Sequence, residues 1–135
     1  MPASGNGVFT IDGMDYRVQV MELKRGFKVT DSEHSGRTQD YSMHRDVIGT
    51  FYNYSLKVEP DPSYRSDYDR FYDVVSAPVN DHQLVFPYNG ETLEFKAYVT
   101  SGDDEFTARL ENGMQINRWS GLTLNFIAME PQRRP

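Results

Sequence analysis

The chain has three histidines, His34, His44 and His82, which are its first candidates for metal binding or acid–base chemistry. They lie far apart in the sequence, and none has a metal-ligand spacing such as H-x-H or H-x-x-x-H. His34 and His44 could approach each other only within the polar stretch 31–46. Solvated loop histidines are the favoured interpretation, and we expect no metal site.

Carboxylates form three groups that could serve general acid–base chemistry. They are Asp31 with Glu33, then Asp67, Asp69 and Asp73, then Asp103, Asp104 and Glu105. A glycosidase needs two carboxylates facing a cleft, one with a raised pKa. These groups instead fall in expected turns or on the polar face of an expected helix, where carboxylates are normally solvated. The stretch DSEHSG also lacks the acidic spacing of a calcium loop.

Signatures of nucleophilic and nucleotide chemistry are missing from the sequence. Ser35-Gly36 and Ser120-Gly121 are only dipeptides, with no G-x-S-x-G elbow, P-loop or G-x-G-x-x-G motif. The absence of cysteine excludes thiol nucleophiles, disulfides and Cys-type zinc sites. We therefore expect no enzyme activity and no cofactor, and a small hydrolase with an unrecognised carboxylate–histidine site is the last alternative.

The length and charge of the chain limit its class. A length of 135 residues fits a single domain with its own core. The net charge of −6 argues against a surface that grips nucleic acid. Phosphate could bind to the basic residues in 17–28 together with Arg37 and Arg45. In an acidic protein, the favoured interpretation is that these side chains form salt bridges between protomers or are solvated. No signal peptide or apolar run of about 20 residues is present, so we expect no membrane association.

Alternating apolar residues predict a mainly β chain. The expected strands span 8–11, 16–20, 27–30, 51–58, 83–88, 93–100, 106–110 and 121–129, and Asp12-Gly13 is a hairpin turn signal between the first two. Residues 1–6 should form a flexible leader, 31–46 a long polar arm or loop, and 130–135 an extended tail. This order predicts a β-sandwich or open barrel in one domain, 1–135, with one helix packed on it.

One segment changes to a helical period. Its apolar stripe predicts a helix over about 62–76, begun by Asp61 with Pro62 or by Ser66. The stripe comprises Tyr64, Tyr68, Phe71, Tyr72 and Val75. Tyr52 and Tyr54 share a strand face with Leu56 and Val58. We expect these aromatics to join helix to sheet rather than to form a binding platform.

The last expected strand is apolar on both faces near its end. Leu122, Leu124, Phe126 and Ala128 share one face, and Ile127 and Met129 lie on the other. Such a strand is either central in a sheet or docks against another chain.

Four phrases in this order resemble small tail proteins of long-tailed bacteriophages and prophages. They are RDVIGTFYNYSLKVEPDPSYRSDYDRFYDVVSAPV, HQLVFPY, LEFKAYVTSG and RWSGLTLNFIAMEP. The resemblance covers about residues 36–131, and it is to tail-tip minor tail proteins and to the N-terminal domain of distal tail proteins. A full-size distal tail protein would carry a further C-terminal domain. We expect a single domain here, and this departure favours a single-domain ring component or a tail-completion protein.

The resemblance implies a tail-tube-like fold and a structural virion protein. Such a protein would form a homo-oligomeric ring, by implication hexameric, that continues or closes the tail tube near the tip or connector. Tube, tape-measure and baseplate or tip proteins would be its partners. DNA would pass through the lumen without specific binding, repelled by acidic walls. Assembly would take place in the bacterial host cytoplasm, and the protein would reside in the virion tail.

Two regions are the expected protein interfaces. Arg37, Tyr41, His44 and Arg45 lie in the polar arm, and Trp119, Ile127 and Met129 lie around the last strand. An alternative function is a carbohydrate- or ligand-binding β-sandwich module that uses exposed tyrosines and Trp119.

Overall fold

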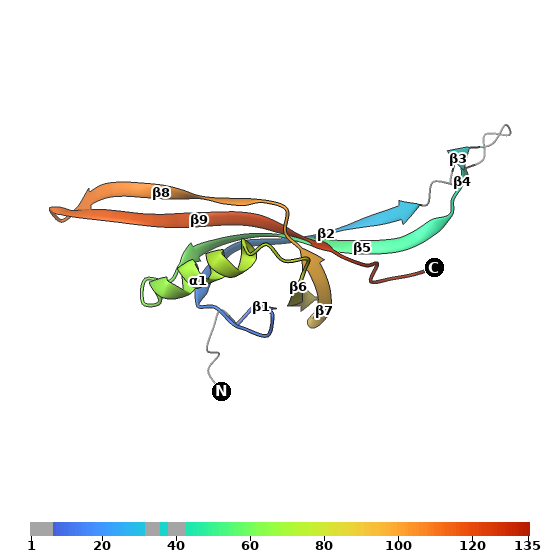
Figure 1. Ribbon diagram of the computed structural model, residues 1–135, viewed down its shortest axis with the longest axis horizontal. Coiled ribbons are helices and arrows are strands. Elements are labelled where there is room, and N and C mark those ends of the chain that lie inside the picture. The colour runs from blue at the N-terminus through green and yellow to red at the C-terminus, as the bar shows by residue number, and fades with distance from the viewer. Residues whose placement is uncertain (1–6, 32–35, 38–42) are drawn as a thin grey trace.

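Two long antiparallel strands, β2 (Val18–Asp31) and β5 (Val47–Pro60), run along the molecule in the computed structural model, which describes residues 7–31, 36–37 and 43–135 (Figure 1). The other strands are β1 (Thr10–Ile11), β3 (Gly36–Arg37), β4 (Met43–His44), β6 (His82–Tyr88), β7 (Glu91–Tyr98), β8 (Gly102–Glu111) and β9 (Met114–Ala128). The single helix of the described residues is α1 (Arg65–Val75). The prediction of a mainly β protein with one helix is confirmed.

Seven strands form one open antiparallel sheet in the order β1-β6-β7-β9-β5-β2, and β8 pairs with β9. Strand β9 is central: Asn53 to Val58 of β5 pair along one of its sides, and β7 and β8 follow each other along the opposite side. Its apolar character on both faces near the end is therefore explained by its place inside the sheet.

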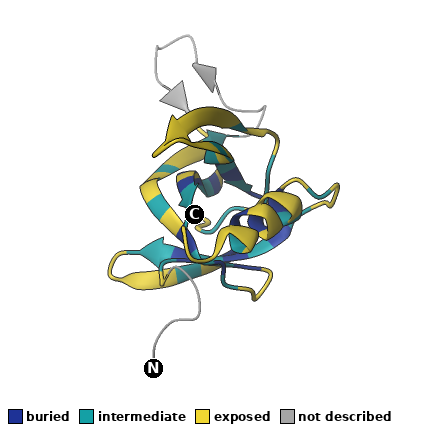
Figure 2. Cartoon of the chain, turned by 90° about the vertical axis from the view of Figure 1, so that its left-hand side faces the viewer, coloured by how far each residue is buried: buried dark blue, intermediate teal, exposed yellow. Residues whose placement is uncertain are grey.

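The core lies between the sheet and α1. In Figure 2, which looks along the long axis, the buried positions gather where the helix faces the strands. Alternate residues of the two central strands are buried: Tyr54, Leu56 and Val58 in β5, and Leu122, Leu124, Phe126 and Ala128 in β9. A series of ring contacts then connects helix and sheet, because Phe71 packs on Phe9 at 5.7 Å, Phe9 on Phe86 at 5.1 Å, and Phe86 on Tyr54 at 4.9 Å between ring centroids.

The helix begins later and without the expected cap. Tyr64 is the N-cap residue and makes no side-chain capping bond, while Asp61 accepts a hydrogen bond from the Ser63 N–H at 3.0 Å in the preceding turn. Of the predicted apolar stripe, Tyr68, Phe71 and Val75 are buried, whereas Tyr64 and Tyr72 are exposed. The stripe thus supplies both the core contact and two surface aromatics.

The expected strands 16–20 and 27–30 are parts of one strand, β2. Its pairing with β5 continues from Val18–Pro60 to Asp31–Val47, with irregularities at Met21 and between Thr30 and Asp31. Half of the intervening residues 21–26 are charged, and the segment carries no clear alternation, because β2 is an edge strand of the sheet and both of its faces meet solvent over much of its length. Charged residues on an edge strand also discourage unwanted strand pairing.

The expected hairpin between 8–11 and 16–20 is wrong in its partner, although its turn is correct. Asp12 and Gly13 have φ of 53° and 78°, and the Ile11 and Met14 backbones exchange hydrogen bonds of 3.0 and 2.9 Å around them. Beyond Met14 the chain does not return alongside β1, and β1 pairs instead with β6. The turn therefore places a short strand at the opposite edge of the sheet from β2.

The polar arm and the tail are described only in part. Residues 1–6, 32–35 and 38–42 lie outside the described residues, and β3 and β4 pair through Gly36–His44 and Arg37–Met43. The tail lies against β5, since the Thr50 N–H donates to the Arg133 carbonyl at 2.8 Å and the Tyr52 N–H to the Gln132 side chain at 2.9 Å.

Candidate protein interface

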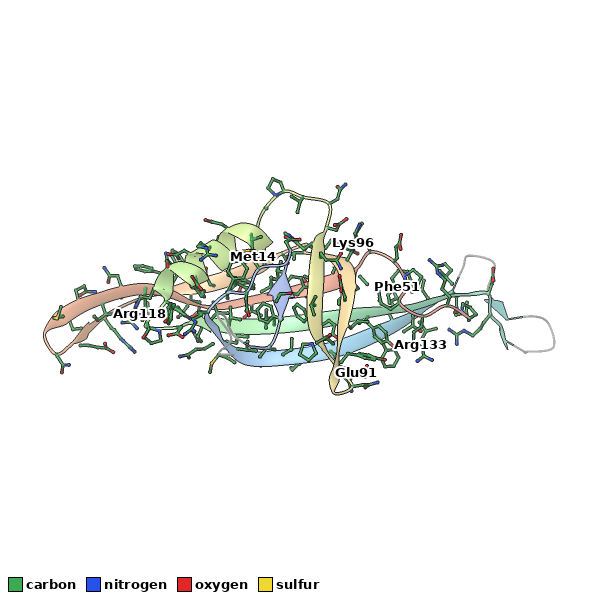
Figure 3. All side chains as sticks on the ribbon, turned by 90° about the horizontal axis from the view of Figure 1, so that it is seen from below. Met14, Phe51, Glu91, Lys96, Arg118 and Arg133 are labelled. Atoms are coloured by element: carbon green, nitrogen blue, oxygen red, sulfur yellow. The ribbon has the colours of Figure 1, made fainter. Side chains whose placement is uncertain are left out.

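Two strand pairs extend beyond the sheet at opposite ends of the molecule (Figure 1). At one end, β8 and β9 pair with each other from Glu105–Ser120 to Glu111–Met114, outside the stretch of β9 that pairs with β5; we call residues 105–120 the β8–β9 hairpin. At the other end, β2 and β5 pair from Gly26–Asn53 to Asp31–Val47. We call residues 24–31 and 47–53, which include Lys24 and Arg25 just before this extension, the β2–β5 ribbon. In Figure 3, Arg118 marks the hairpin end, and Phe51 and Arg133 mark the ribbon end.

The β8–β9 hairpin is rich in exposed apolar side chains. Phe106, Leu110, Met114 and Trp119 expose between 49% and 71% of their surface. Phe106 and Trp119 are cross-strand neighbours, with ring centroids 5.0 Å apart. A two-stranded hairpin is only marginally stable in water, and exposed apolar patches of this kind usually mark interaction sites.

A bulge at Gly121 directs Trp119 to the inner side of the sheet. The pairing of β8 with β9 shifts between Asp103–Thr123 and Glu105–Ser120, so that β9 has one residue more than β8 in this interval. Gly121 occupies the bulge with φ of +74°, and its N–H donates to Glu59 Oε2 at 2.9 Å. One extra residue reverses the alternation of side chains between the two faces of β9, so Trp119 lies on the same inward face as Leu122.

Trp119 therefore faces α1 across a groove of about 620 Å³, which we call the helix–hairpin groove. Its lining residues are Tyr68, Asp69, Tyr72, Asp73, Gly102, Asp103, Asp104 and Trp119. The groove combines three aromatic side chains with four carboxylates. Such a surface suits a partner that presents both cations and apolar groups.

Tyr68 and Asp104 close the floor of this groove. The buried Tyr68 hydroxyl donates to Asp104 Oδ2 at 2.8 Å. Burial, assisted by the Asp104 carboxylate, raises the pKa of Tyr68 well above its usual range. The hydroxyl therefore stays protonated and holds the carboxylate in place, which makes this pair structural in character.

The β2–β5 ribbon presents a different chemistry. Phe27 is 70% exposed, and Lys24, Arg25 and Lys28 are exposed beside it. At its base the Tyr52 and Tyr88 hydroxyls lie 3.0 Å apart. This hydrogen bond lowers the pKa of Tyr52 and raises that of Tyr88, and Arg25 lies over the Tyr88 ring at 5.7 Å.

The candidate residues of the polar arm do not form one described cluster. Tyr41 lies outside the described residues, and Arg37 and His44 are placed only through their backbone pairing in β3 and β4. Arg45 forms a salt bridge with Asp31, with Nη2 2.9 Å from Oδ1 and Nε donating at 3.0 Å. This salt bridge joins the two chain segments on either side of the polar arm. A role of Arg45 in contacts with another chain stays a prediction.

The three candidates near the last strand lie in separate places. Trp119 lines the helix–hairpin groove, while Ile127 is partly buried between Asn53 and Tyr98 in the sheet. Met129 is 42% exposed beyond the end of β9, and its N–H donates to the Lys96 carbonyl at 2.9 Å. Their role as interface residues stays a prediction.

Sequence reasoning missed most of the hairpin and the ribbon. The sequence predicts a strand over Phe106–Leu110 and a hairpin-like turn at 111–113, and both are confirmed. Residues 114–120, the partner strand, were not predicted. Asn112 and Gly113 have φ of 51° and 76°, as this type of turn requires. The polar sequence QINR conceals the strand because both of its faces meet solvent.

The remaining polar chemistry is sparse. Within residues 7–31, 36–37 and 43–135, no group of three or more histidines and carboxylates is arranged to hold a metal ion. In the same part of the chain, no helix is long and apolar enough to cross a membrane.

A comparison of the sequence with known protein families and with curated proteins finds no match.

Proposed function

We propose that this protein is a structural subunit of a bacteriophage tail, without enzyme activity, that assembles into a ring continuing or closing the tail tube near the tip or connector. The observation that carries this proposal is the pair of strand extensions at opposite ends of one small sheet, both with exposed apolar residues. Surfaces at two different places on a subunit favour head-to-tail contacts, which form a ring where the rotation between neighbours closes. The phage assignment itself rests on the resemblance of residues 36–131.

In this proposal the subunit resides in the virion tail after assembly in the bacterial cytoplasm. Its neighbours are copies of itself, six in the ring that the resemblance implies, and tube, tape-measure and baseplate or tip proteins. The net charge of −6 supports passage of DNA without specific binding, because an acidic lumen repels phosphate.

The experiment is a measurement of self-association over a wide concentration range. We expect light scattering after size-exclusion chromatography to detect oligomers, and negative-stain microscopy to image rings. A protein that stays strictly monomeric up to about millimolar concentration, where even millimolar affinity would be detected, would contradict the proposal.

A second candidate is a carbohydrate-binding module, favoured by the position of Trp119 opposite Tyr68 and Tyr72 in the helix–hairpin groove. Trp119 is the single tryptophan, so its fluorescence reports directly on the groove. A response to one member of a glycan panel would favour this candidate, and a uniform lack of response would exclude it.

A further inference from the structure

We propose that the helix–hairpin groove of one copy receives the basic β2–β5 ribbon of a second copy. This inference rests on the self-assembly proposed above and specifies its contact surfaces. It assigns the acidic and aromatic lining of the groove as the receptor, and the exposed lysines of β2 as the inserted element.

The groove offers carboxylates that can take new partners. Asp69, Asp73 and Asp103 are exposed at its margin, whereas Asp104 is held by Tyr68. Within the part of the chain that the structure describes, no salt bridge neutralises these three exposed carboxylates. Arg70, the nearest helical arginine in sequence, pairs with Asp67 at 2.9 Å.

The ribbon offers matching cations on a strand that nothing covers within the described residues. Strand β2 is the last strand of the sheet, so the exposed Lys24 and Lys28 can reach another molecule. Arg25, between them, donates to Asn89 Oδ1 at 3.1 Å and lies over the Tyr88 ring. Lys24 contacts Glu22 at 2.8 Å, but both side chains are more than half exposed. An exposed pair of this kind contributes little and can be exchanged for a better partner.

The charges of the two ends are opposite in sign. Residues 59–77 and 102–121, which form α1 and the hairpin end, carry nine carboxylates and four arginines, a net charge of −5. Residues 24–31, 45–53 and 129–135, which form the ribbon end, carry six basic and three acidic residues, a net charge of +3. The molecule is therefore acidic at one end and basic at the other, although its overall charge is negative.

This polarity selects a second copy as the occupant. Complementary charges on two ends of one chain fix a heterologous, head-to-tail contact, in which each copy uses its groove toward one neighbour and its ribbon toward the other. Apolar groups complete the match, because Phe27 of the ribbon and Trp119 of the groove are both more than half exposed. Burying such aromatic rings supplies affinity, and the charges supply orientation.

The test reverses the charges of each surface in the full chain. The groove variant is Asp69→Lys with Asp73→Lys, two exposed positions where lysine is a better helix former than aspartate. The ribbon variant is Lys24→Glu with Lys28→Glu. The control is Asp81→Lys with Glu94→Lys, beside and on β7, which changes the net charge as much as the groove variant does but lies outside both surfaces.

Sedimentation velocity compares each variant alone and in an equimolar mixture. We expect the groove and ribbon variants each to associate at least about tenfold more weakly than wild type, because like charges then meet. The control should associate as wild type does. Mixing the two variants should restore assembly, because a basic groove then meets an acidic ribbon and the reverse, and a folding defect would not be corrected by mixing.

The outcomes separate this inference from the proposed function. If wild type forms no oligomer at any concentration, both are wrong. If wild type assembles and the reversals act no more strongly than the control, this inference alone is overturned. If both variants are weakened but the mixture is not restored, the two surfaces do not meet, and the groove serves another partner.

Discussion

His82 is a buried residue of β6, with only 3% of its surface exposed, so the prediction that it is a solvated loop histidine is wrong. Its Nδ1 lies 2.8 Å from Asp12 Oδ2. Asp12 also accepts the Gln83 N–H through Oδ1 at 2.9 Å, so one carboxylate joins the β1 turn to β6. Burial opposes ionisation of Asp12, but the hydrogen bonds from His82 and Gln83 outweigh it and hold the pKa of Asp12 below its usual value.

Asp12→Asn tests this pair. Asparagine tolerates the positive φ of residue 12 and retains an acceptor oxygen, so the change removes mainly the charge. Because the folded-state pKa is lowered, wild type gains stability above the unfolded pKa of about 4 and loses it as the pH falls through the folded value. We expect urea denaturation to show a loss of about 0.5–1 kcal/mol at pH 7. A difference that persisted undiminished at pH 2 would contradict this explanation.

At the scale of elements, Gly121 connects the core to the β8–β9 hairpin. The residue adopts φ of +74° in the bulge, and a Cβ placed there would meet only Glu59 Oε1, at 4.0 Å. Substitution is therefore limited by backbone conformation and not by space. The bulge sets the face on which Trp119 lies, and hence the lining of the helix–hairpin groove.

A graded series at residue 121 follows from this geometry. Gly121→Ala should cost about 1–2 kcal/mol, Gly121→Asn less, and Gly121→Val more, because asparagine tolerates a left-handed backbone and β-branched residues do not. Chemical denaturation gives the free energies of unfolding, and Trp119 fluorescence reports any change of its surroundings. The neighbouring Ser120→Ala should change stability by less than about 0.5 kcal/mol. Equal stability of the alanine and valine variants would be inconsistent with the bulge.

The elements that the sequence predicts well are those with one buried face. The stripe of Tyr68, Phe71 and Val75 predicted α1 within a few residues, and the alternation of Leu122, Leu124 and Phe126 predicted the inner face of β9. The middle of β2 and residues 114–118 of β9 were not predicted as strand. Both segments are exposed on two faces, so their strand conformation depends on pairing and leaves no hydrophobic period.

The candidate interface was predictable only in its parts. The sequence indicates Trp119 as an interface candidate, and it indicates Asp69, Asp73 and Asp103 only as solvated carboxylates. Their convergence was not predictable, because it requires a bulge at Gly121 and the packing of α1 against β5 and β2, two features that depend on distant residues. The basic ribbon was likewise noted only as a cluster near the start of the chain.

At the scale of the whole molecule, charge is distributed along the long axis and not uniformly. The helix and hairpin end is acidic, and the ribbon end is basic. Two copies therefore repel each other through their net charge of −6 at long range but attract each other where opposite ends meet. These two effects respond differently to salt, because screening removes distant interactions before close ones.

Self-association should weaken as sodium chloride rises from about 0.1 to 1 M. The Debye length falls from roughly 10 to 3 Å over this range. Repulsion between whole copies is therefore already largely screened at about 0.1 M salt. The attraction between contacting ends acts over shorter distances and is lost as the salt concentration rises towards about 1 M. We expect the dissociation constant from sedimentation velocity to rise at least about tenfold. The urea midpoint of the dilute monomer should move much less, because the pairs of lysine or arginine with carboxylates among the described residues are partly exposed and contribute little to stability. Association that stayed constant or strengthened with salt would mean that the apolar residues Phe27, Phe106 and Trp119 alone drive assembly, since burial of apolar surface does not weaken when charges are screened.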